Sequence, residues 1–259
     1  MNSPPPALLV AGHGTRDDAE AFREFVGELG RRHPDLPVAG GLLEPAEPSL
    51  GAAFAELVAR GARRIAAVPL TLSAGNAVPS ALAREAERHP GVSCLHGRPL
   101  GPHPALLDVL ERRLDEALGG RDPRARAEVT VLLVGRGSTD PGANAEVHAA
   151  ARLLWEGRGY AGVEPAFLSP AAPDVPSGLD RCVRLGARRI VVLPYSLFPG
   201  VLPDRVGQQA EGWAEAHPEV EVVPAGVIGP GPELLELVTE RYREAVAGDP
   251  RTGGHGDEH

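Results

Sequence analysis

An internal duplication with a constant offset limits, more than any other feature, what this chain can fold into. Three segments of the first half return 125 residues later: 43–48 as 168–173, 61–65 as 186–190, and 68–70 as 193–195. Residues 8–14 (LLVAGHG) are also echoed at 131–137 (VLLVGRG). A repeat of this length indicates a duplicated domain rather than a solenoid. We therefore expect two homologous domains, residues 1–122 and 123–247, followed by a flexible tail, 248–259.

Each half alternates short apolar runs, bounded by Gly or Pro, with segments of helical periodicity. This alternation predicts an α/β fold in which each domain is a small parallel sheet flanked by helices. The expected strands are residues 7–11, 38–43 and 65–72 in the first half, and 129–134, 163–168 and 190–195 in the second. Apolar stripes predict helices around 22–29, 50–58 and 106–114, and a closing helix over 233–246.

Ligands of open parallel sheets bind beyond the carboxyl ends of the strands. The loops that begin at Gly12, Glu44 and Thr71 should therefore converge on one site in the first half. The matching loops of the second half begin at Gly135, Ser169 and Ser196.

His13 directly follows the first strand, between two glycines, which is the position of a site residue rather than a core residue. It is a candidate base or metal ligand, and Glu44, at the end of the second strand, is its natural carboxylate partner. The second half has Arg136 and Ser169 at these positions, so only the first half can supply the pair. Alternatively, Glu44 and Glu47 begin the next helix, where carboxylates favour the helix dipole.

The glycine turns that follow the first strands do not match a dinucleotide or phosphate-loop motif. Arg136 could bind a carboxylate or phosphate through its planar fork, or could pair with Asp140. The other histidines lie at helix boundaries or without a partner at ligand spacing.

Composition removes several classes of function. All 26 basic side chains are arginines, which excludes Schiff-base chemistry, a pyridoxal-phosphate anchor and a phosphate-loop lysine. A net charge of −9 argues against nucleic-acid binding. Cys94 and Cys182 match no metal or redox spacing, and no apolar run is long enough to span a bilayer. We expect a soluble, cytoplasmic protein.

Several motifs together resemble the long, two-domain sirohydrochlorin cobaltochelatase family (CbiX-like, class II chelatases). They include the GHGTR start, the segment LEPAEPSL, VGRGSTDP at 134–141, and GARRIVVLPY at 186–195, and the similarity runs over residues 7–246. The resemblance implies insertion of Co²⁺, or of Fe²⁺ or Ni²⁺ in relatives, into a polycarboxylated tetrapyrrole in a cleft between two chelatase-like halves. It implies no permanently bound cofactor, because the divalent metal is a substrate. It also implies that His13 holds the metal or accepts a pyrrole proton, assisted by Glu44.

The chain departs from the family pattern after its third strand. Relatives carry a second histidine in this loop, whereas the loop that ends at Pro79 is about four residues shorter here and contains none. In the second half, Asp204 stands where relatives usually have lysine. A site with one histidine has weaker metal affinity. Either Asn76, Glu44 or a substrate carboxylate completes the metal's ligands, or the ancestral reaction is lost.

The leading hypothesis is a chelatase acting on sirohydrochlorin or a related tetrapyrrole, with His13 and Glu44 as catalytic residues and metal ligands. Arg136, Arg205, Ser73 and Asn76 are the candidate substrate-binding residues. One alternative is a carrier that binds metal or tetrapyrrole without turnover, and another is an enzyme repurposed for a different small molecule. The sequence leaves the metal, the true substrate, and the choice between monomer and homodimer open.

Overall fold

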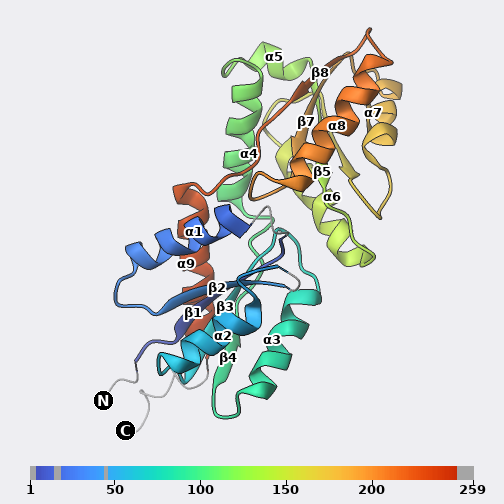
Figure 1. Ribbon diagram of the computed structural model, residues 1–259. Helices are drawn as coiled ribbons and strands as arrows, with labels where there is room; N and C mark the ends of the chain where they lie inside the picture. Colours follow the sequence, from blue (N-terminus) through green and yellow to red (C-terminus); the bar gives the residue numbers. More distant parts are fainter. Residues whose placement is uncertain (1–3, 15–18, 44–45, 250–259) are drawn as a thin grey trace, which may run out of the picture. The chain divides into compact units, whose positions relative to one another are not determined.

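A computed structural model describes residues 4–14, 19–43 and 46–249 of the chain, which form two compact units (Figure 1). The first unit comprises the described residues up to Thr71, Gly75–Leu100, and those from Leu234 on. The second comprises Leu72–Ala74 and Gly101–Glu233. No helix within the described residues is long and apolar enough to cross a membrane.

The first unit is built around a parallel sheet of four strands in the order β2-β1-β3-β4. Its strands are β1 (Ala7–Gly12), β2 (Val38–Leu42), β3 (Arg64–Leu70) and β4 (Ser93–His96). Its helices are α1 (Ala19–Arg32), α2 (Leu50–Ala59) and α3 (Ala77–Arg88), joined by most of α9 (Pro232–Ala247).

The second unit repeats this sheet in the order β6-β5-β7-β8, again with all strands parallel. Its strands are β5 (Val129–Gly135), β6 (Gly162–Phe167), β7 (Arg189–Pro194) and β8 (Glu221–Pro224). Its helices are α4 (Pro104–Ala117), α5 (Pro123–Ala127), α6 (Pro141–Trp155), α7 (Val175–Arg184) and α8 (Val201–Glu215). The predicted α/β class, with two small parallel sheets flanked by helices, is confirmed.

Two glycines of β2 show how helices cover both faces of the first sheet. A Cβ atom on Gly40 would overlap the Val26 side chain of α1, and one on Gly41 would lie 2.5 Å from the Cα of Leu50 in α2. Since successive strand residues point to opposite faces, α1 and α2 lie on opposite sides of the sheet. Residues of α3 join α2 in the apolar core on the same side.

The last helix of each repeat packs with the other unit. In sequence, α4 ends the first repeat and α9 ends the second, yet α4 belongs to the second unit and α9 to the first. Tyr242 of α9 donates a hydrogen bond to the Pro6 carbonyl at 2.7 Å, and the Arg241 side chain donates to the Pro99 carbonyl at 3.0 Å. The boundaries 1–122 and 123–247 therefore remain a prediction for the repeats, while the compact units have exchanged helices.

The predicted flexible tail needs one correction at its start. Asp249 is 4% exposed, and its carboxylate lies 2.7 Å from the Arg64 guanidinium of β3. The chain is thus held at least to this residue, and residues 250–259 lie outside the described part of the structure.

Candidate active site

Three strands of the first sheet end at the same level. Gly12, the last residue of β1, is paired in register with Leu42 of β2 on one side and with Leu70 of β3 on the other. His13 follows immediately and is exposed at this edge. The strand ends from which the first-half loops start are therefore neighbours, and the convergence of the loops themselves stays a prediction.

Gly12 is required here for its small size. A Cβ atom at this position would lie 2.8 Å from Leu42 Cδ2 and 2.9 Å from Phe22 Cε2, closer than real carbon atoms approach. The backbone amide of Leu43 donates to the Gly12 carbonyl at 3.0 Å, which ties the end of β2 to the end of β1. The residues that precede His13 and Glu44 are therefore hydrogen-bonded neighbours. Glu44 itself lies outside the described residues, so its role stays a prediction.

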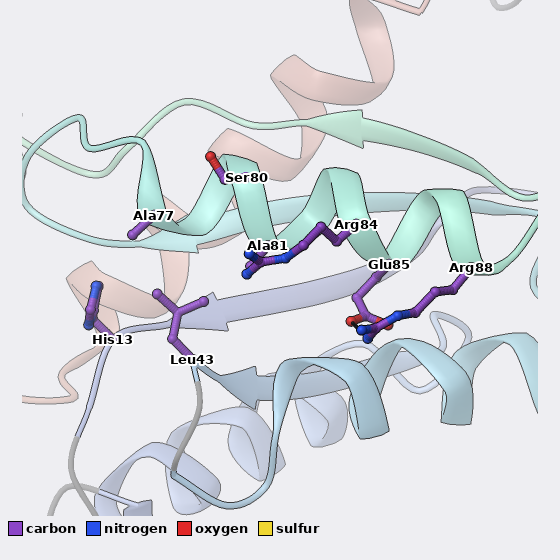
Figure 2. Close-up of a pocket in the computed structure, with 8 residues that line it drawn as sticks. All are labelled: His13, Leu43, Ala77, Ser80, Ala81, Arg84, Glu85 and Arg88. Atoms are coloured by element: carbon purple, nitrogen blue, oxygen red, sulfur yellow. Dashed lines mark hydrogen bonds and ion pairs between the residues drawn. The ribbon is translucent and has the colours of Figure 1, made fainter.

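A pocket of about 590 Å³ opens beside His13 in the first unit (Figure 2). Leu43 and one face of α3 complete its lining: Ala77, Ser80, Ala81, Arg84, Glu85 and Arg88. Their helical spacing places them along one side of α3. Figure 2 shows His13 and Ala77 at one end of the pocket and Arg88 at the other.

Of the two arginines that line the pocket, Arg88 forms an ion pair within the described part of the chain and Arg84 does not. Arg88 Nη1 donates to Glu85 Oε1 at 2.6 Å, and the Glu85 side chain is largely buried whereas that of Arg88 is exposed. Arg84 is exposed, and its side chain makes no hydrogen bond or ion pair with the described residues.

The loop between β3 and α3 carries two of the predicted substrate-binding residues. Asn76 is exposed and directly precedes α3, whose next residue, Ala77, lines the pocket. Ser73 is half-buried and belongs to the second unit, where the adjacent Ala74 amide donates to Glu146 at 2.6 Å. Residues 71–76 (TLSAGN) contain no histidine.

The remaining two candidates lie in the second unit. Arg136 is exposed directly after β5, at the position that corresponds to His13. The following Gly137 adopts a left-handed backbone with φ of +87°, and a Cβ atom there would lie 2.6 Å from the Ser169 carbonyl oxygen. Arg205 is exposed near the start of α8.

Glu47 has a local structural role in the turn before α2. Its carboxylate accepts a hydrogen bond from the Ser49 amide at 2.9 Å, and Ser49 caps α2 by accepting from the Ala52 amide. Because α2 begins at Leu50 with Ser49 as its N-cap, Glu47 lies in the preceding turn and not, as the alternative expected, at the beginning of the helix.

The described residues include no cluster of three or more His, Cys, Asp or Glu side chains that could hold a metal ion. Burial raises the pKa of the Cys94 thiol to about 11 and that of Cys182 to about 12. Both cysteines are therefore protonated and poorly nucleophilic near neutral pH.

The sequence model of one family, CbiX, matches both repeats of this chain, over residues 7–117 and 130–245. The chain belongs to the CbiX family. His13 lies within the first matched segment, and Arg136 lies within the second.

Curated CbiX-family relatives and a solved structure agree with this assignment. The chain is 35% identical to the sirohydrochlorin cobaltochelatase of Priestia megaterium, over 94% of this chain and 81% of that protein. It is 30% identical to the sirohydrochlorin ferrochelatase of Bacillus subtilis strain 168, over 93% and 92%. The crystal structure of the sirohydrochlorin chelatase SirB from Bacillus subtilis subspecies spizizenii in complex with cobalt superposes with a TM-score of 0.75 at 26% identity, covering 96% and 98%.

Sequence reasoning predicted the strand-end position of His13, which lines the pocket, but missed the α3 wall of that pocket. The strand-end position of His13 is visible in the sequence, because an apolar run stops there at glycine. The α3 residues carry a weaker signal, a spacing of three and four residues between Ala77, Ser80, Ala81, Arg84 and Arg88. That spacing marks a helix face, but it does not say what the face borders.

Proposed function

We propose that this chain is a chelatase that inserts Co²⁺ or Fe²⁺ into sirohydrochlorin. The observation that carries the proposal is the exposed His13, which follows β1 where three parallel strands end in register. The chain that carries this histidine belongs to the CbiX family. The named relatives are a cobaltochelatase and a ferrochelatase of the same tetrapyrrole.

The reaction exchanges one divalent metal ion for two pyrrole N–H protons. A neutral imidazole can coordinate such an ion through one nitrogen, or can accept one of the protons, because imidazoles titrate near neutrality. His13 is assigned one of these roles and Glu44 the assisting carboxylate. The first assignment rests on the position of His13 directly after β1. The second rests on the sequence alone, in which Glu44 directly follows Leu43.

The metal is a substrate, so its site must also release it. A single imidazole with oxygen ligands binds divalent ions less tightly than several histidines do. The shortened 71–76 loop supplies no second histidine to the metal. The missing ligand is proposed to come from Asn76, Glu44 or a carboxylate of the tetrapyrrole. Arg136, Arg205 and Ser73 are proposed to bind the tetrapyrrole's carboxylates.

A second candidate function is a carrier that binds metal or tetrapyrrole without turnover. It is favoured by the loop without a histidine at residues 71–76. Carrier and enzyme differ in whether one protein molecule processes more than one tetrapyrrole.

The test follows the absorbance change of metal-free sirohydrochlorin with Co²⁺ or Fe²⁺, with and without a substoichiometric amount of protein. A chelatase accelerates metal insertion over many equivalents. A carrier binds one equivalent and leaves the spontaneous rate unchanged, which would overturn the proposed enzyme activity.

A further inference from the structure

The α3 wall of the His13 pocket contains two guanidinium groups and one carboxylate. Arg88 and Glu85 form an ion pair, with 2.6 Å between Arg88 Nη1 and Glu85 Oε1. Arg84, four residues before Arg88 on the same face, lines the pocket without a hydrogen bond or ion pair to any residue that the structure describes. Its positive charge is therefore left for something that enters the pocket.

Glu85 is badly placed to neutralise Arg84 as well. Its side chain is only 11% exposed and packs against Gly51 of α2, where an added Cβ atom would lie 3.3 Å from Glu85 Oε1. The carboxylate is thus confined between α2 and Arg88. With two arginines against one glutamate, this wall is positive on a chain whose net charge is −9. An anion repelled by the rest of the surface is attracted to the pocket.

The position of Arg84 along α3 indicates the shape of the ligand. Ala77 lies at the His13 end of the pocket in Figure 2, and Arg84 lies seven residues further along the helix. Seven residues of α-helix span about 10 Å, and Figure 2 shows the Arg84 side chain running back toward Ala81, so its guanidinium lies between the two ends of the pocket. A ligand that fills the pocket would therefore have its reacting atoms near His13 and an anionic group to one side of them. A tetrapyrrole has this arrangement, because its pyrrole nitrogens are central and its carboxylates are peripheral.

We infer that Arg84 binds a peripheral carboxylate of the tetrapyrrole substrate and so positions the macrocycle over His13. The inference rests on the proposed function, since it takes the substrate from there. Arg84 acts on the substrate's rim, so it is a binding residue that does not take part in metal transfer.

The variant Arg84→Gln tests the inference, with Arg63→Gln as the matched control. Arg63 is an exposed arginine of the same unit that does not line the pocket, so both changes remove one surface charge. Loss of a charge-assisted hydrogen bond should raise the KM for sirohydrochlorin about tenfold in Arg84→Gln, with kcat within about twofold of the wild type. Arg63→Gln should leave both constants unchanged. Arg84→Lys keeps the positive charge but loses the planar guanidinium, so its KM should lie between those of the wild type and Arg84→Gln.

Binding of metal-free sirohydrochlorin, followed by its fluorescence, separates this inference from the proposed function. If the wild type binds the tetrapyrrole without accelerating insertion, the chelatase proposal fails, while a weaker Kd in Arg84→Gln still supports the carboxylate site. If Arg84→Gln matches Arg63→Gln in both KM and Kd, or lowers kcat alone, the assignment of Arg84 is overturned.

Discussion

A metal ion that is to be handed to a tetrapyrrole must bind its protein ligands firmly enough to be caught and weakly enough to leave. One imidazole, such as that of His13, meets both conditions better than a closed set of several nitrogen and sulfur ligands. Assistance then falls to a nearby carboxylate.

Glu44 and Glu47 are three residues apart in the sequence, and substituting each of them separates a site role from a structural one. Glu44 follows the residue that is hydrogen-bonded to Gly12, whereas the Glu47 carboxylate is occupied by the Ser49 amide. We expect Glu44→Gln to lower the rate of metal insertion by about 10- to 100-fold, the usual effect of removing a group that supports a metal ligand. Glu47→Gln should keep the rate within about twofold. Initial rates at saturating Co²⁺ distinguish the two, and equal rates would remove Glu44 from the site.

Whether a residue's place at the pocket could be predicted from the sequence depends on the element that carries it. His13 was predictable because the end of a buried parallel strand is a site position in any open sheet. Arg84 was not, because a charged residue on a helix face is usually solvated, and only the fold shows that this face borders the pocket of His13.

At the scale of the secondary structure elements, the site depends on three strands that end together. The small Gly12 lets Phe22 of α1 and Leu42 of β2 close against the end of β1. The central strands were predictable from their apolar runs. The fourth strands, β4 and β8, were missed because they are four residues long, lie at the sheet edges and carry polar, partly exposed residues.

Substituting Gly12 with alanine tests this close packing. Gly12→Ala should lower the free energy of unfolding by about 1–3 kcal/mol, because its Cβ atom would overlap Leu42 and Phe22. The control is Gly30→Ala in α1, where an added Cβ atom has nothing within 4 Å. Alanine is favoured over glycine in helices by up to about 1 kcal/mol, so this variant should be as stable as the wild type or more so. Urea unfolding gives both values, and a neutral Gly12→Ala would contradict the packing.

At the scale of the whole molecule, the duplication is clear in the sequence but the exchange of helices is not. The offset of 125 residues identifies the repeats and predicts their strands. Helix α9 resembles any amphipathic closing helix, and its sequence does not reveal which sheet it covers. Hydrogen bonds from α9 to Pro6 and Pro99 show that it packs with the first unit.

This exchange predicts that core variants in α4 and α9 destabilise the unit that is remote in sequence. Leu237 of α9 is 2% exposed and Leu110 of α4 is fully buried, so truncating either to alanine should cost about 2–5 kcal/mol. Leu237→Ala should speed amide hydrogen exchange in β1 and β3, and Leu110→Ala should speed it in β5 and β7. Faster exchange in the sheet of each helix's own repeat would contradict the exchanged packing.

The complete absence of lysine determines which cations the whole molecule can use to bind an anion. Every cation that this chain can offer to an anionic substrate is a guanidinium, whose fork suits carboxylates. Arg84, Arg136 and Arg205 are the candidates that the sequence and the pocket provide.

The central claim is that His13 serves metal insertion, and one rate comparison tests it most directly. Initial rates of Co²⁺ insertion into sirohydrochlorin are measured for the wild type, for His13→Ala, and for His96→Ala, an exposed histidine of the same unit that does not line the pocket. The account predicts a fall of about 100-fold or more for His13→Ala, to near the spontaneous rate, and no change for His96→Ala. Equal, accelerated rates for His13→Ala and the wild type would contradict it.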